Sequence, residues 1–335
     1  MLENILEKLY QGKYINIKES RQLFENIIEG NISSIQLAGI LIGIKVRGES
    51  SEEIAGASDV LLANAKPFPR PNYAFADITG TGGDCNNTIN VSTISAIVAA
   101  TCGAKIAKHG NHGISGKIGS ADLIKQLNIP LDMSPEFSRI TLDKLGICFL
   151  HAPYYHKSFK NTLSVRKKLK TTTLFNVIGP LINPAKPPLA LIGVYKIELM
   201  EIMIKTLKLL KYRRAIVVHC NGTDEVMLHA PTQVKELNDS KIEEYTLTAK
   251  DFGLQPCEIS KTSQQDKYLN AIRLLQGKGN HTHEKVIAAN VAMLLKLFGH
   301  ENLNKNVDLA LNNIHNGTAY KHLMLLTEKR NKNCE

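Results

Sequence analysis

Glycines and hydroxyl side chains gather in one stretch, residues 77–120, where their types and spacing suit the binding of phosphate. The letters GTGGD at residues 80–84 follow a short apolar run. The glycines lack a Cβ, so the backbone there can turn tightly and approach a ligand closely. Residues 90–93, with the sequence NVST, then open an apolar run that ends near Gly103. Ser and Thr at such a position can cap a helix, and the free N–H groups at a helix start attract anions.

A second loop of this kind follows the next apolar run, residues 104–107. It reads KHGN at residues 108–111 and continues with further glycines to residue 119. The pattern predicts strand, glycine loop, helix, strand, basic glycine loop and helix. Because parallel strands of an open α/β sheet end at one edge, both loops should meet where such sheets bind ligands. They predict a phosphate cradle, although GTGGD matches neither the P-loop nor the dinucleotide fingerprint.

Four further residues could carry chemistry, each with a plainer alternative. Asp224 and Glu225 follow a β-branched run and a glycine turn. Adjacent carboxylates at a strand end suit Mg²⁺, but an ordinary acidic surface turn has the same composition. Arg166 offers a planar guanidinium for a carboxylate, or is simply an exposed helical arginine. His156 is interpreted as a structural histidine.

The surrounding elements predict an α/β protein with a helical N-terminal part. Apolar residues recur at helical spacing in four short segments of residues 1–66, and Ser50 with Glu53 forms a capping box before the fourth segment. Prolines crowd residues 67–71 and predict a stiff connector at a domain boundary. Strands and helices then alternate. Residues 232–237 and 241–247 should form an antiparallel hairpin.

Composition excludes several classes of protein. The 335 residues are 43% hydrophobic and 21% charged, as in globular proteins, and no apolar run is long enough to cross a membrane. Six scattered cysteines form no CxxC pair, which disfavours a zinc site or a disulfide framework. We expect a cytoplasmic protein without a signal peptide. The net charge of +10 is spread along the chain, so a compositional bias explains it better than nucleic-acid binding.

The motifs GTGGD, NVST and KHGN, in this order and spacing, resemble the anthranilate phosphoribosyltransferases. KVRGE at residues 45–49 and GPLINPA at residues 179–185 extend the resemblance over almost the whole chain. It implies a small all-helical domain, residues 1–71 rejoined by residues 158–186. It also implies a large α/β domain, residues 72–157 and 187–335, with a mostly parallel central sheet and helices around it. A homodimer formed through the small domain is implied as well.

The reaction implied by this resemblance is a step of tryptophan biosynthesis. The 5-phosphoribosyl group of 5-phosphoribosyl 1-diphosphate passes to the amine of anthranilate, giving N-(5-phosphoribosyl)anthranilate and diphosphate. No residue need act as general base. Mg²⁺, two ions per active site, is implied at Ser92, Asp224 and Glu225. Anthranilate would be positioned by Gly80, Asn111 and Arg166. The donor-binding residues implied are Gly80, Gly83, Asp84, Thr88, Asn90, Val91, Ser92, Thr93, Lys108, His109, Gly110, Asn111, His112, Gly113, Ile114, Ser115, Gly116 and Ser120.

Three positions depart from the family's pattern. His112 stands where Arg is usual, Cys85 where Gly is usual, and Thr172-Thr173 where the family has Arg-Thr. We expect His112 to weaken phosphate binding, because a histidine carries full charge only below about pH 6.5. We expect Thr172 to remove a domain-linking ion pair.

Two other functions remain open on the sequence. A pyrimidine nucleoside phosphorylase would share the architecture, but GPLINPA and the acidic pair disfavour it. A non-enzymatic relative that binds nucleic acid should have lost GTGGD or the acidic pair, and both are intact.

Overall fold

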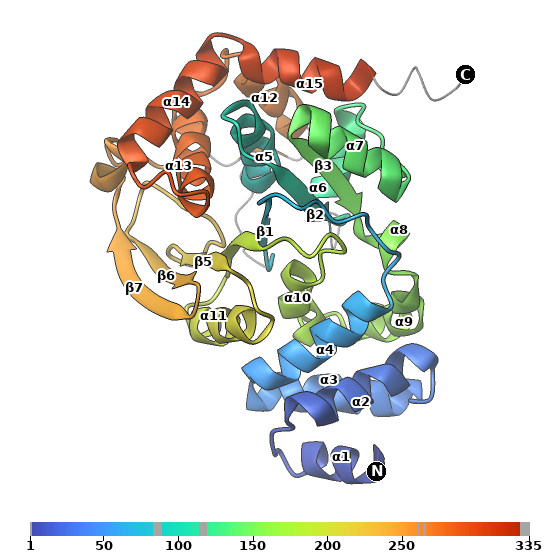
Figure 1. Ribbon diagram of the computed structural model, residues 1–335. Helices are drawn as coiled ribbons and strands as arrows, with labels where there is room; N and C mark the ends of the chain where they lie inside the picture. Colours follow the sequence, from blue (N-terminus) through green and yellow to red (C-terminus); the bar gives the residue numbers. More distant parts are fainter. Residues whose placement is uncertain (1, 83–88, 114–118, 260–261, 264–265, 329–335) are drawn as a thin grey trace.

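A seven-stranded sheet forms the centre of the computed structural model, which describes residues 2–82, 89–113, 119–259, 262–263 and 266–328 (Figure 1). The strand order is β3-β2-β1-β4-β5-β6-β7. Strands β1 to β5 pair in parallel, whereas β6 and β7 form the expected antiparallel hairpin beside β5. Their bounds are Ala76–Gly80, Ile106–Gly110, Ile147–His151, Leu189–Gly193, Arg214–His219, Thr232–Asn238 and Lys241–Leu247. The predicted mostly parallel sheet is confirmed.

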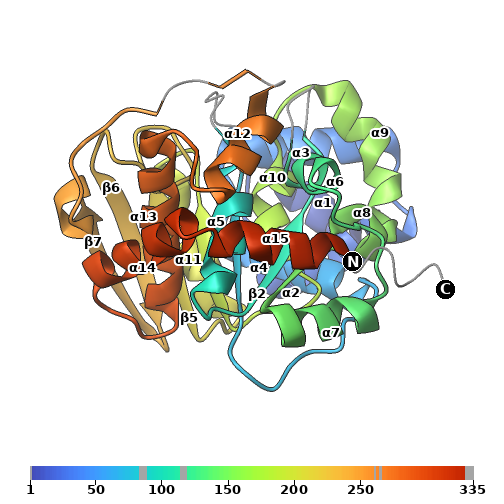
Figure 2. The same ribbon diagram turned by 90° about the horizontal axis from the view of Figure 1, so that it is seen from above.

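The central strands are apolar throughout because both faces of the sheet are covered. In β4, Leu189 and Leu191 pack into one core, whereas Ala190 and Ile192 pack into the other. A strand buried on both sides needs continuous rather than alternating hydrophobicity. The first core lies under helices α5, α6, α12, α13, α14 and α15, and Figure 2 shows α14 and α15 on this side. These helices span Val91–Thr101, Ser120–Gln126, Asp266–Leu275, His281–Leu297, Leu303–His315 and Thr318–Glu328.

The opposite face of the sheet packs against α11 and continues into the N-terminal helices. α4 contacts α11, and the two share one apolar cluster with α1, α2 and α3. Helices α9 and α10, from the middle of the chain, pack against α2, α3 and α4, as Figure 1 shows at the lower end of the molecule. The bounds of α1 to α4 and α9 to α11 are Leu2–Tyr10, Ile17–Glu29, Ser34–Arg47, Ser51–Ala63, Lys160–Leu169, Leu174–Ile178 and Glu198–Leu209.

Capping determines where several helices begin. The Asn16 side chain accepts from the Glu19 N–H, and the Glu19 carboxylate accepts from the Asn16 N–H, so α2 starts at Ile17. Asn280 likewise caps α13, which begins at His281. Helices α7 (Pro135–Leu145) and α8 (Ala152–Tyr155) flank β3. Within the described ranges, no helix combines the length and apolar character that a membrane span requires.

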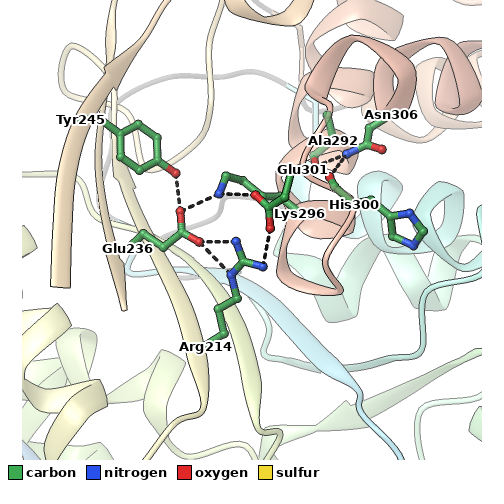
Figure 3. Close-up of polar contacts among 8 residues, drawn as sticks. All are labelled: Arg214, Glu236, Tyr245, Ala292, Lys296, His300, Glu301 and Asn306. Carbon is green, nitrogen blue, oxygen red and sulfur yellow. Dashed lines mark hydrogen bonds and ion pairs between the residues drawn. The ribbon is translucent and has the colours of Figure 1, made fainter. Parts of the chain in front are cut away.

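A charged network ties the far strands to α13 (Figure 3). Arg214 Nε donates to Glu236 Oε1 at 2.8 Å, and the Lys296 ammonium and Tyr245 hydroxyl contact Glu236 Oε2 at 2.9 and 2.6 Å. Glu301 also accepts from Arg214 and Lys296. Burial raises the pKa of Glu236, but the hydrogen bonds from Tyr245, Lys296 and Arg214 outweigh it, so the pKa is lowered overall.

Candidate active site

The two glycine loops leave the carboxyl ends of β1 and β2, which are paired in parallel. The expectation that they lie at neighbouring strand ends is therefore confirmed. α5 begins at Val91, inside the NVST motif, so its first backbone N–H groups face this edge. Six predicted site residues and one departure lie outside the described residues, together with most of the two loop tips. They are Gly83, Asp84, Thr88, Ile114, Ser115, Gly116 and Cys85.

The acidic turn after β5 packs directly onto the first glycine loop. A Cβ built on Gly80 would lie 2.2 Å from Asp224 Oδ2, and one on Gly193 would lie 1.5 Å from the Asp224 carbonyl oxygen. The Gly82 N–H donates to Asp224 Oδ2 at 2.7 Å. Glycine is therefore required at residues 80 and 193 for close approach, and the structure brings the predicted metal pair to the predicted phosphate loop.

Lys108 lies beneath the same edge. Its side chain is almost fully buried, and Nζ donates to the Ile78 carbonyl at 2.7 Å and to Ser92 Oγ at 3.2 Å. Burial lowers the pKa of Lys108, while the charges of Asp77 and Glu225 oppose that shift. A buried ammonium is thus held among Ser92, the acidic turn and the start of the glycine loop.

Asp77 is a site residue that sequence reasoning missed. Its Oδ1 accepts from the His109 N–H at 3.2 Å, and its Oδ2 accepts from Asn183 Nδ2 at 2.8 Å. Asn183 also donates to the Ala107 carbonyl at 2.7 Å. This asparagine of GPLINPA therefore bonds to both β1 and β2, next to Lys108. Burial raises the pKa of Asp77 to about 6, although Lys108 and these hydrogen bonds oppose the shift. The sequence signal that could have revealed it is a single Asp within the apolar run of β1.

Asp122, also missed, closes the second loop. Its Oδ2 accepts from the N–H groups of Gly113 and Gly119 at 2.9 and 2.8 Å, and its Oδ1 lies 2.6 Å from His112 Nδ1. Burial raises the pKa of Asp122, but these hydrogen bonds lower it overall. One carboxylate therefore joins both ends of the loop. The local signal was its place as the third residue of α6, directly after the glycine-rich loop.

The other residues of KHGN contribute mainly backbone. A Cβ on Gly110 would lie 2.3 Å from Ser120 Oγ, so Ser120 covers Gly110 closely. The Asn111 carbonyl accepts from the Ala121 N–H at 3.1 Å, and Asn111 Oδ1 accepts from the His112 N–H at 2.8 Å. The His109 ring is buried, and burial, His156 and Lys108 hold its pKa well below the ordinary value. His109 therefore serves this edge as a neutral residue.

Arg166 comes from α9 and lies over the ring of Phe175, with Cζ 5.0 Å from the ring centroid. Burial lowers its pKa, and no acidic side chain among the described residues forms an ion pair with it. His156 donates from Nε2 to the Ile182 carbonyl at 2.7 Å, in keeping with the structural role predicted for it. Lys45 Nζ lies within hydrogen-bonding reach of Thr171 and 3.4 Å from Thr172 Oγ1, so α3 still contacts this segment.

Fold and site together define a glycosyl transferase built from a helical bundle and an α/β domain. Residues 3–65 match the model of the glycosyl transferase family's helical bundle domain, and residues 72–320 match that of its a/b domain. An anthranilate phosphoribosyltransferase of Sodalis glossinidius is 57% identical over 98% of this chain and 100% of its own. That of Blochmanniella pennsylvanica is 56% identical over 99% and 98%. The chain belongs to the anthranilate phosphoribosyltransferase family, as its motifs predict.

Solved structures of this family superpose on nearly the whole of this chain. The anthranilate phosphoribosyltransferase of Thermus thermophilus superposes with a TM-score of 0.90 at 30% identity, over 97% of this chain and 98% of that one. The Saccharomyces cerevisiae enzyme, solved in complex with PRPP and Mg, superposes with a TM-score of 0.88 at 26% identity, over 98% and 97%.

Proposed function

We propose that this protein transfers the 5-phosphoribosyl group of 5-phosphoribosyl 1-diphosphate to the amine of anthranilate, in tryptophan biosynthesis. One observation carries the proposal. The acidic pair and Lys108 meet at the edge where GTGGD, NVST and KHGN converge, with Asp224 against Gly80 and Lys108 bonded to Ser92. An adjacent anion site and cation site suit a substrate whose phosphates carry about four to five negative charges.

We assign the donor to this edge. The donor residues inside the described ranges are those of NVST, KHGN, His112, Gly113, Gly80 and Ser120. Lys108 and the N–H groups at the start of α5 would neutralise and hold the phosphates as diphosphate departs. The chemistry of Asp224, Glu225 and Ser92 fits Mg²⁺, because all three offer hard oxygen ligands. When bound, Mg²⁺ would offset the leaving group's charge, and we propose two ions per site.

The acceptor position follows from Arg166. Its half-buried guanidinium lies on the Phe175 ring and has no acidic partner among the described residues, which suits an aromatic carboxylate. Gly80 and Asn111 would complete the acceptor site at the strand edge. Substitution at the ribose carbon needs the amine placed below it, and an aromatic amine needs no protein base.

The assembly and the division of the chain are also proposals. We propose a small domain of residues 1–71 with 158–186, the remainder forming the large domain. α3 supports a homodimer through the small domain, because Ile35 and Val46 on it are 86% and 82% exposed. The free thiols of the described cysteines support a cytoplasmic location.

The direct test is the loss of anthranilate fluorescence when purified protein, donor and Mg²⁺ are combined. Diphosphate should appear in equal amount, and omitting donor or Mg²⁺ should stop both signals. Uridine and inorganic phosphate in place of the two substrates should give no product. Phosphorolysis of uridine without anthranilate turnover would replace this proposal by the phosphorylase alternative.

A further inference from the structure

A separate cluster of metal-binding side chains lies where α13 begins and α14 ends. His281 and Glu284 are three residues apart in the first turn of α13, so they share one face of that helix. His315 is the last residue of α14. His281 Nδ1 and His315 Nε2 each lie 3.1 Å from the same oxygen, Glu284 Oε2. One ligand atom from each residue lies within 4.8 Å of the other two.

The Glu284 carboxylate is unusual for its surroundings. The residue is only 1% exposed, and among the described residues its other oxygen, Oε1, has no hydrogen-bond partner. Burying a carboxylate oxygen without a partner costs free energy, which a bound cation offsets. The two imidazoles address only Oε2. One oxygen of the Glu284 carboxylate therefore contacts both histidines, whereas the other oxygen has no hydrogen-bond partner among the described residues.

We propose that His281, Glu284 and His315 form a binding site for a divalent transition-metal ion, with Zn²⁺ as the ion to test. Two imidazole nitrogens and one carboxylate oxygen are a zinc donor set. Ligands about 2.1 Å from a tetrahedral ion lie about 3.4 Å from one another, close to the spacing here. Mg²⁺ prefers all-oxygen sites, so this ion is chemically distinct from the one at the acidic turn.

The neighbouring backbone holds the three ligands together. A Cβ on Gly277, in the turn between α12 and α13, would lie 2.9 Å from the Ile314 carbonyl and 3.0 Å from His315 Cα. The turn therefore packs directly against the end of α14. The His281 side chain is 88% exposed and that of His315 is 48% exposed, so an ion can enter from solvent and keep a water ligand.

A bound ion would clip α13 to α14 at one end. Farther along α13, Asn290 accepts from the Val226 N–H at 3.2 Å and donates to the Val226 carbonyl at 2.9 Å. Val226 follows Glu225 directly, so α13, the helix that the ion would join to α14, also holds the acidic turn in place. The ion should stabilise the folded chain, because it binds a site that the unfolded chain lacks.

The test uses the full chain, freed of metal with a chelator and returned to buffer with excess Mg²⁺. Zn²⁺ titration by calorimetry should show one saturable site, and Zn²⁺ should raise the melting temperature. Co²⁺ should give the strong visible absorption of a low-coordinate nitrogen and oxygen site. His281→Ala, at an exposed position, should still fold without metal, but it should weaken Zn²⁺ binding at least about tenfold and abolish the Co²⁺ band.

The matched control is His300→Ala, which removes an exposed histidine outside the cluster and should change neither signal. His315→Ala should reproduce the effect of His281→Ala. Two results would overturn the proposal. One is the absence of Zn²⁺ binding by the wild type, which would leave the cluster as an imidazole–carboxylate network. The other is wild-type affinity in both alanine variants, which would move the ion elsewhere.

Discussion

Nε2 of His112 lies 3.0 Å from Nε2 of His151, at the end of the neighbouring strand β3. Because the Asp122 carboxylate can only accept, His112 Nδ1 carries the proton of that contact, and a proton between the two Nε2 atoms joins the rings of His112 and His151. Burial first, and then the nearby His112, lowers the pKa of His151, while Asp132 opposes the shift. The residue that replaces the family's arginine is thus engaged on both ring nitrogens, and it joins the second loop to β3.

Replacing His112 separates its two roles. His112→Arg should tighten donor binding at pH 7.5 or leave it unchanged, because a permanent cation then stands in the phosphate loop. It should also lower stability by about 1 kcal/mol, because the imidazole contact with His151 is lost. Donor KM and urea unfolding measure the two effects. A double-mutant cycle of His112→Ala and His151→Ala should give a nonzero coupling energy, and strictly additive effects would contradict the contact.

Arg166→Ala should raise the anthranilate KM about 10- to 150-fold, the cost of a lost charge-assisted hydrogen bond. The donor KM should change little, because Arg166 lies on α9 and not on the glycine loops. Lys168→Ala, an exposed cation on the same helix, is the control and should behave as the wild type. An unchanged anthranilate KM in Arg166→Ala would remove this residue from the acceptor site.

Asp224→Asn and Glu225→Gln should each abolish most turnover without lowering the melting temperature. Asparagine can still accept from the Gly82 N–H, so the loop contact survives while one negative charge is lost. The loss should fall on kcat as well as donor KM, and higher Mg²⁺ should partly restore it. Asp239→Asn, in the exposed β6–β7 turn, provides the control. Wild-type rates with unchanged Mg²⁺ dependence would make the pair an ordinary acidic turn.

The network of Figure 3 should be a large source of stability rather than of activity. Glu236→Gln leaves Arg214 and Lys296 facing a neutral side chain in a buried place, so it should cost about 3 kcal/mol of unfolding free energy. Glu243→Gln, on the exposed face of β7, should cost under about 0.5 kcal/mol. Urea unfolding of both variants checks this. Equal costs would show that the network contributes no more than a surface pair.

Acid should destabilise the protein through His156, which is buried and neutral in the folded chain. Burial, the largest effect, lowers the pKa of His156 to about 4 despite its hydrogen bond to Ile182. Below about pH 6.5 His156 becomes protonated in the unfolded chain but stays neutral in the folded chain down to about pH 4. The free energy of unfolding therefore falls as pH falls. For this residue alone the loss at pH 5 is about 2 kcal/mol. His156→Gln should flatten the pH dependence by that amount, and parallel curves for variant and wild type would contradict it.

The sequence alone determined the local elements and the family. Apolar period, capping residues and glycines are local signals, so the α/β class, the β6–β7 hairpin and the two loops beside neighbouring strands could all be predicted. The motifs GTGGD and KHGN and the acidic pair were sufficient to predict the family, because they occur in the family's order and spacing. The exact starts of α2 and α13 depend on the capping residues Asn16 and Asn280, side chains that lie outside the apolar stripe.

The tertiary structure decided which distant residues meet. Asp77 and Asn183 are over a hundred residues apart, and only the fold shows that they bond behind Lys108. His112 is a departure by sequence, but its contacts with Asp122 and His151 exist only because β2 and β3 lie side by side. Likewise, no linear motif joins His281 and Glu284 to His315. Contacts between elements depend on long-range packing, which the local pattern of a single chain does not encode.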